Sequence, residues 1–326
     1  MLSKLKKKTL LSLALVGLFY LAFTIYADFN DVISAFEKFN WWLLFPLLFL
    51  SLVNYLVRFY KWDYYLALLK IHINKIDSLS IFLAGLIMTV TPGKMGELLK
   101  SYLTKEVTGT PISKTAPIIF VERITDFLAL LIISIIGAYV FNYGRSIIIG
   151  VSLFLFGVLI IVSNKNIAIS FLKLLGQNKF LLKHLQKVHN AYETSYILLR
   201  PVPLLKMTIV SIISWLAECL GYYLILLNFG IENSFLWAAF SYAFATIVGA
   251  ISMLPGGLGV TEGSLTFMLI RIGKSKEVAV ASTFLIRVVT LWFAVLVGIL
   301  SVIFYQKRFG TIAVDEVTDS GGQSKN

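Results

Sequence analysis

The sequence predicts an all-α polytopic membrane protein, with about six spanning helices and two re-entrant helical hairpins arranged as an inverted repeat. Three observations support this class. The 326 residues are 58% hydrophobic and only 14% charged, which is incompatible with an ordinary soluble domain. Several apolar runs reach the roughly 20 residues that a helix needs to cross a bilayer. Two Pro-Gly breaks interrupt apolar sequence at matching places in the two halves.

The two breaks are residues 89–97, TVTPGKMGE, and residues 252–262, SMLPGGLGVTE. Pro removes a backbone donor and Gly tolerates non-helical dihedral angles, so each pair should end a helix and leave polar backbone groups without helical partners. In hydrocarbon such groups are tolerated only inside protein or beside a wet cavity. Interrupted segments at matching positions of two halves are therefore the best sequence sign of a transporter's binding site.

An arginine in apolar sequence follows each break at nearly the same distance, Arg123 after the first and Arg287 after the second. The residues of the two breaks also align, Pro92 with Pro255, Gly93 with Gly256, and Gly96 with Gly259. We therefore predict one integral membrane domain over residues 1–326, in which repeat 1 covers about 9–142 and repeat 2 about 146–305.

Apolar runs locate the helices. The predicted spans are about 9–27, 41–57, 115–141, 146–163, 203–228 and 277–305, with hairpins at about 78–104 and 235–272. The second span would emerge at Arg58 and Lys61, which we assign to the cytoplasmic side because cytoplasmic loops collect basic residues. The same rule places the N- and C-termini in the cytoplasm of a multi-pass cell-membrane protein. Three crossings then separate the two breaks, which makes the repeat inverted.

The chain is basic, with 29 Lys and Arg against 17 Asp and Glu, a net charge of +12. Such an excess can indicate nucleic-acid binding, but positive cytoplasmic loops explain it better, so we expect no nucleic-acid partner. The stretch of about 165–200 is predicted to be a basic amphipathic connection on the cytoplasmic side. It either sets topology alone or also gathers anionic lipid. The tail of about 310–326 is predicted to be disordered.

Several kinds of chemistry find no support in the sequence. A single cysteine, Cys219, excludes an intramolecular disulfide, and the three histidines have no paired ligand spacing. We expect no metal and no cofactor. The sequence has no G-x-S-x-G, H-E-x-x-H or P-loop lysine motif, so it gives no sign of a hydrolytic enzyme.

Arg123 and Arg287 are the leading candidates for the site. An arginine deep in a spanning segment costs at least ~2.5 kcal/mol on insertion scales, so it should face the bundle interior and a partner. Its planar fork suits a phosphate or a carboxylate. Either the two guanidiniums hold a lipid phosphate near the midplane, or each forms a structural ion pair. The candidate partners in the second case are Asp126 or Glu97 for Arg123, and Glu262 or Glu218 for Arg287.

Two further acids flank the first arginine. Glu122 and Asp126 are four residues apart and share one helix face, and with Arg123 they cannot all point one way. One carboxylate should neutralise an arginine, while the other meets Lys94 or binds a proton. Charge neutralisation within the bundle is the alternative to proton coupling.

The start of each return half-helix carries an acid, Glu97 or Glu262. An acid there either complements the positive helix N-terminus or contacts substrate or a coupling ion. Backbone N–H groups at such a terminus also form an anion site, for which Lys94 would add a point charge unless it reaches to the cytoplasmic surface. The glycines that allow this backbone geometry are Gly93, Gly96, Gly256, Gly257 and Gly259.

Three motifs together resemble the membrane region of the lysylphosphatidylglycerol synthase/flippase family, also called the flippase-like integral membrane family. They are PGKMGE at 92–97, VERITD at 121–126 and LPGGLGVTEG at 254–263. The similarity spans about 10–305 and implies a protein that handles lipids with polar head groups. In the bifunctional relatives this region flips aminoacylated phosphatidylglycerol, and some archaeal relatives are linked to glycosylation with polyprenyl-linked saccharides. Because this sequence stops at Asn326 without an aminoacyl-transfer domain, we expect no lysyl transfer.

The leading hypothesis is a lipid flippase or carrier that does not use ATP. Its substrate would be an anionic phospholipid or a polyprenyl phosphate, moved through a groove between the inverted halves. The alternative is a membrane glycosyltransferase, or an accessory factor in glycolipid synthesis, with Glu97 or Asp126 as its base. A scaffold for membrane complexes is a third hypothesis. The sequence leaves open the exact lipid, the direction, the energy source and whether the chain forms a homo-oligomer.

Overall fold

The computed structural model describes residues 29–91, 96–163 and 185–310. Within these ranges the chain is helical, with short connecting turns and no strand. Some predicted features lie outside the described residues: the first span at about 9–27, the tail after Gly310, most of the basic connection, and Pro92, Gly93 and Lys94 of the first break.

Five helices in the described part are long and apolar enough to cross a membrane, which confirms an all-helical, multi-pass membrane protein. They are Trp41–Leu68, Ile112–Phe141, Arg145–Val162, Pro201–Asn228 and Lys276–Phe309. In the order of the chain they comprise η1 (Trp41–Leu43) with α3 (Leu44–Leu68), α6 (Ile112–Phe141), α7 (Arg145–Ser163), α11 (Pro201–Asn228), and α14 (Lys276–Arg287) continued by the π-helical turn η5 (Val288–Trp292) and by α15 (Phe293–Phe309).

The second predicted span is longer than its apolar run indicates. α3 continues about three turns beyond Val57. Lys61 is only 1% exposed. The prediction that the span emerges at Arg58 and Lys61 is therefore wrong, because the helix continues past both and Lys61 is buried. Hydropathy ends the span at the first cation, whereas polar partners on neighbouring helices allow these charges to stay inside.

The first break separates α4 (Lys75–Gly85) and the turn η2 (Leu86–Val90) from α5 (Leu99–Thr108). α4 begins after Asn74, whose side chain accepts a hydrogen bond from the N–H of Ile76 at 2.9 Å. On the far side of the break, the N–H of Gly96 donates to Oγ1 of Thr91 at 2.9 Å. This bond joins the two sides of the break, and α4 packs against α5.

The second break separates α12 (Phe235–Ile251) from α13 (Val260–Arg271), with the short turn η4 (Pro255–Gly257) between them. Pro255 therefore lies in the interruption, not inside a helix. Gly256 and Gly259 have φ angles of +61° and +87°. Side chains rarely allow such angles, which explains why glycine occupies these positions.

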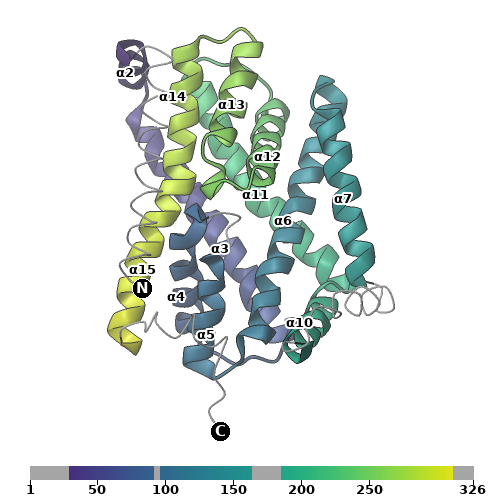
Figure 1. The fold of residues 1–326 in the computed structure, drawn as a ribbon. Coiled ribbons are helices and arrows are strands. Elements are labelled where there is room, and N and C mark those ends of the chain that lie inside the picture. The colour runs from purple at the N-terminus through teal and green to yellow at the C-terminus, as the bar shows by residue number, and fades with distance from the viewer. Residues whose placement is uncertain (1–28, 92–95, 164–184, 311–326) are drawn as a thin grey trace.

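The two helix pairs lie in opposite halves of the molecule, with α4 and α5 in the lower half of Figure 1 and α12 and α13 in the upper half. The turns η2 and η4 contact each other where the halves meet. α4, from the N-terminal half of the sequence, packs on α15 from the C-terminal half, and α12, from the C-terminal half, packs on α6 from the N-terminal half. Two shorter helices complete the bundle: α2 (Phe29–Glu37) lies on α14, and α10 (Leu185–Leu198) lies on α6 and α7.

Candidate functional site

A cavity of about 640 Å³ lies between the two breaks. Residues of η2, η4, α3, α6, α11, α12 and η5 surround it, and residues of α7 line one side. The lining is mostly apolar, and its charged residues are Arg58, Arg123, Asp126, Glu218 and Arg287. An apolar cavity with a few convergent polar groups is the usual form of a small-molecule site.

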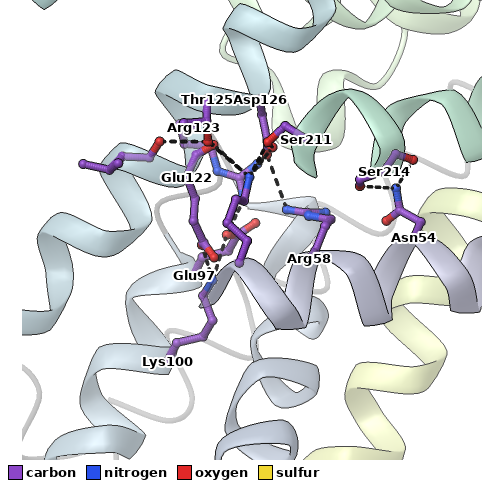
Figure 2. Close-up of polar contacts among 12 residues, drawn as sticks. Asn54, Arg58, Glu97, Lys100, Glu122, Arg123, Thr125, Asp126, Ser211 and Ser214 are labelled. Atoms are coloured by element: carbon purple, nitrogen blue, oxygen red, sulfur yellow. Dashed lines mark hydrogen bonds and ion pairs between the residues drawn. The ribbon is translucent and has the colours of Figure 1, made fainter. Parts of the chain in front are cut away.

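Arg123 joins α6 to the turn that leads into α5 (Figure 2). Its Nη2 donates to Oε2 of Glu97, and its Nη1 lies 3.5 Å from Oδ2 of Asp126. Both partners considered from the sequence therefore bind this arginine. Neighbouring Glu122 pairs with Lys100, whose Nζ lies 2.6 Å from Oε2 of Glu122. Glu122 and Asp126 thus serve different cations although they share a helix face.

Asp126 lies at the centre of contacts among α3, α6 and α11. Its Oδ1 accepts hydrogen bonds from Nζ of Lys61 at 2.6 Å and from Oγ of Ser211 at 3.0 Å. Lys61 also donates to Oγ of Ser211 at 2.8 Å and to Oγ1 of Thr125 at 3.2 Å. These partners compensate the loss of hydration that a buried lysine and a buried carboxylate suffer.

Arg287 binds groups of its own half. Its Nε donates to Oε1 of Glu262 at 2.7 Å, and its Nη2 donates to the carbonyl oxygen of Gly256 at 2.6 Å. The other oxygen of Glu262 accepts the N–H of Gly259 at 2.8 Å, at the start of α13. Arg287 therefore holds the second break in shape through a carboxylate that also caps the following helix.

Glu218 was the second candidate partner for Arg287. Its Oε2 instead accepts a hydrogen bond from the hydroxyl of Tyr242 at 2.7 Å. The sequence could not show which acid pairs with Arg287, because Glu262, Glu218 and Arg287 lie on three different helices. The structure gives the direct contact to Glu262.

Arg58 is less engaged than the other two cavity arginines. With the described residues it makes one ion pair, at 3.7 Å to Oδ2 of Asp126, and no hydrogen bond. Nε of Arg123 is also buried without an acceptor in this part of the chain. Both residues line the cavity, and a guanidinium has five donors. An anion with several oxygens is the natural complement of these donors.

The structure thus brings most predicted residues into two groups. The first contains Glu97, Glu122, Arg123 and Asp126, with Gly96 at the edge of the break, and the second contains Arg287, Glu262, Gly256, Gly257 and Gly259. Among the described residues no cluster of His, Cys, Asp and Glu is arranged to hold a metal ion.

Sequence reasoning missed Arg58, Lys61 and Lys100 as members of this site. A signal was present, because Asn54, Arg58 and Lys61 follow one another at helical spacing and so share one face of α3. Asn54 belongs to the same polar face, and its Nδ2 donates to Oγ of Ser214 at 2.8 Å. Polar residues along one face of an apolar helix are compatible both with a buried contact between helices and with the end of a membrane span.

Comparison with known proteins gives consistent matches. A family model described as the lysylphosphatidylglycerol synthase TM region matches residues 9–298. A UPF0104 membrane protein of Methanocaldococcus jannaschii is 28% identical over 232 residues, which cover 67% of this chain and 93% of the relative. One from Pyrococcus horikoshii is 24% identical over 277 residues, covering 76% and 82%. One from Methanothermobacter thermautotrophicus is 34% identical over 90 residues, covering 28% and 27%. The family match includes both breaks and every charged residue of the cavity lining.

Proposed function

We propose that this chain, which belongs to the family of the lysylphosphatidylglycerol synthase TM region, carries a phosphate-bearing lipid across the cell membrane. The main support for this proposal is the cavity between the two breaks. Its lining includes three arginines from three different helices, Arg58, Arg123 and Arg287. An anionic phospholipid or a polyprenyl phosphate has a head group that matches these cations. Its hydrocarbon matches the rest of the lining.

The charges of the lining favour an anion. Among the described lining residues, three arginines face two carboxylates, Asp126 and Glu218. Arg58 has only a 3.7 Å ion pair with the described residues, and Nε of Arg123 has no acceptor there, so these two arginines are the residues that bind the phosphate. In a site shielded from water such charge-assisted contacts are stronger than they are in solution.

The arrangement of the helices supports alternating access. We propose that α4–η2–α5 and α12–η4–α13 are re-entrant hairpins that enter from opposite sides of the membrane. We also propose that residues 9–27 supply the sixth span and that both termini are cytoplasmic. The reciprocal packing of α4 on α15 and of α12 on α6 agrees with two inverted repeats. Movement of one half against the other would expose the cavity to each leaflet in turn.

A glycosyltransferase is less well supported. Such an enzyme needs a base beside the acceptor, and the candidates were Glu97 and Asp126. Both carboxylates bind Arg123, and Asp126 also binds Lys61. The geometry therefore uses these acids to compensate cations, and the carrier is the better interpretation.

The test is lipid translocation by the full-length protein in phosphatidylcholine vesicles. Two probes are compared, phosphatidylglycerol and a polyprenyl phosphate, each with a fluorescent label on its chain that is quenched from outside. Arg58→Gln and Arg123→Gln should each slow the transported probe about tenfold or more, as expected when a charge-assisted bond of about 1.5–3 kcal/mol is lost. Arg271→Gln, at an exposed arginine outside the cavity lining, is the matched control. Movement of both probes no faster than in protein-free vesicles would overturn the proposal.

A further inference from the structure

Part of the cavity lining is apolar and exposed, and a charged head group does not account for it. Four large apolar residues line the cavity and are nevertheless largely exposed: Phe154, Ile251, Met253 and Leu254. Their exposed fractions are 70%, 52%, 63% and 45%. A side chain that both lines a cavity and is exposed lies at an opening. We call the exposed part of the lining that comprises Gly150 and these four residues the lateral mouth.

α7 forms one side of the lateral mouth. It stands at the right edge of the bundle in Figure 1 and packs against α6 and α10. Only 11% of its apolar 18-residue stretch is buried, compared with 56% of the corresponding stretch of α6. Most of the surface of α7 therefore faces outward. Gly150 and Phe154 are one turn apart on the face of α7 that lines the cavity. The opening therefore lies on the side of the bundle, where a spanning helix meets hydrocarbon.

The rim and the interior have opposite chemistry. Arg58, Arg123 and Asp126 lie in the cavity, whereas the rim of the lateral mouth is apolar. If the lateral mouth faced water, several large apolar side chains would be hydrated at a cost in free energy. If it faces acyl chains, this cost is absent. The ligand that fits both parts at once has one charged end and one long apolar end.

We propose that the hydrocarbon chain of the bound lipid leaves the cavity through the lateral mouth, between α7 and residues 251–254, while its phosphate contacts Arg58 and Arg123. This inference rests on the proposed carrier function and adds the route of the chain. The chain stays in the bilayer during transport, and only the head group crosses the cavity. The occupant of the lateral mouth is therefore an acyl or isoprenoid chain, not a segment of another protein.

Two glycines of α7 allow a matched test. A Cβ built at Gly150 or at Gly157 meets no atom within 4 Å, so both positions accept a side chain without a clash. Gly150 lines the cavity, whereas Gly157, two turns further along the same helix, does not. Gly150→Trp should place a bulky ring in the lateral mouth, and Gly157→Trp should place the same ring outside it. Folding is compared by size-exclusion chromatography and thermal unfolding in detergent.

The transport measurement uses the vesicles described above and whichever probe the wild type moves faster. Gly150→Trp should lose most of the translocation above the protein-free background, and Gly157→Trp should keep the wild-type rate. Equal rates in the wild type and Gly150→Trp would overturn the inference while leaving the carrier function intact. Loss of transport in both variants, together with loss of a dimer, would overturn it in favour of a second copy covering α7.

Photo-labelling gives an independent result. The same lipid is prepared with a diazirine near the start of its chain, irradiated in vesicles with the full-length protein, and the labelled peptides are identified by mass spectrometry. Label in residues 148–156 or 250–256, reduced by Gly150→Trp but not by Gly157→Trp, supports the lateral mouth. Label confined to other helices of a transporting wild type overturns it. A wild type that neither transports nor labels either probe refutes the carrier function itself.

Discussion

The two breaks align in sequence but are held in different ways. At the second break, Arg287 binds a carbonyl of the break and the carboxylate that caps α13, so the whole unit belongs to one half. At the first break, Arg123 binds Glu97 and Asp126, and Asp126 in turn binds Lys61 of α3 and Ser211 of α11. The contacts of the second arrangement lie within one half of the sequence, whereas the first is part of a network that joins α3, α6 and α11, and both arginines line the cavity.

Two arginines that align in sequence thus differ in their contacts and in their burial. Glu262 is fully buried, and the side chain of Arg287 is 9% exposed. The side chain of Arg123 is 19% exposed, and one of its donors has no acceptor in the described part of the chain. We therefore propose that the second arginine maintains the fold and that the first contacts the ligand. Each of the following predictions tests this division.

The largest effect is expected for Arg287→Ala. It removes the partner of a fully buried carboxylate and a hydrogen bond to the break, so it should lower the free energy of unfolding by about 3–5 kcal/mol. Arg123→Ala should lower it by less than half of that, because its partners keep Lys61, Lys100 and Arg58 nearby. Denaturant unfolding in mixed micelles measures both values. Equal losses in the two variants would contradict the division.

The contrast also shows which features the sequence could predict. The bounds of α7 and α11 were predicted within a few residues because each is a long, predominantly apolar run. The second break was predicted because Pro255 lies among glycines. The extension of α3 was missed because the groups that compensate Lys61 lie on α6 and α11, far away in sequence. Partner choice for Arg287 stayed open for the same reason, since tertiary packing alone decides which acid is near.

An intermediate effect is expected for the pair formed by Lys100 and Glu122, which are 2% and 1% exposed and do not line the cavity. Lys100→Met alone leaves Glu122 buried without its ion pair and should cost about 3 kcal/mol, the lower end of the range for such pairs. The double variant Lys100→Met with Glu122→Leu removes both charges and should recover most of that stability. Unfolding of the two single variants and the double variant in micelles measures the coupling.

Transport separates this pair from the cavity arginines. Because neither Lys100 nor Glu122 lines the cavity, the double variant should move the lipid probe at a rate close to that of the wild type. Arg58→Gln should fail to do so even if its stability is unchanged. A stable double variant that has lost transport would place substrate or a coupled proton on this pair, and the first break would then have two functional centres.

The smallest effect on stability is expected for the hydroxyl of Thr91, which links the two sides of the first break. Oγ1 of Thr91 accepts the N–H of Gly96 at 2.9 Å and donates to the carbonyl of Met88 at 2.6 Å. Thr91→Val removes these bonds and should favour local opening by about 1 kcal/mol, which raises amide exchange around Gly96 about fivefold. Thr104→Val is the control, because among the described residues its hydroxyl bonds within α5, to the carbonyl of Lys100. Hydrogen exchange measured by mass spectrometry distinguishes the two variants.

If the first break changes conformation during transport, the local destabilisation in Thr91→Val should change the transport rate more than the same loss of free energy elsewhere in the protein. An unchanged exchange rate in Thr91→Val would instead mean that the first break is held as firmly as the second, by contacts other than this hydroxyl.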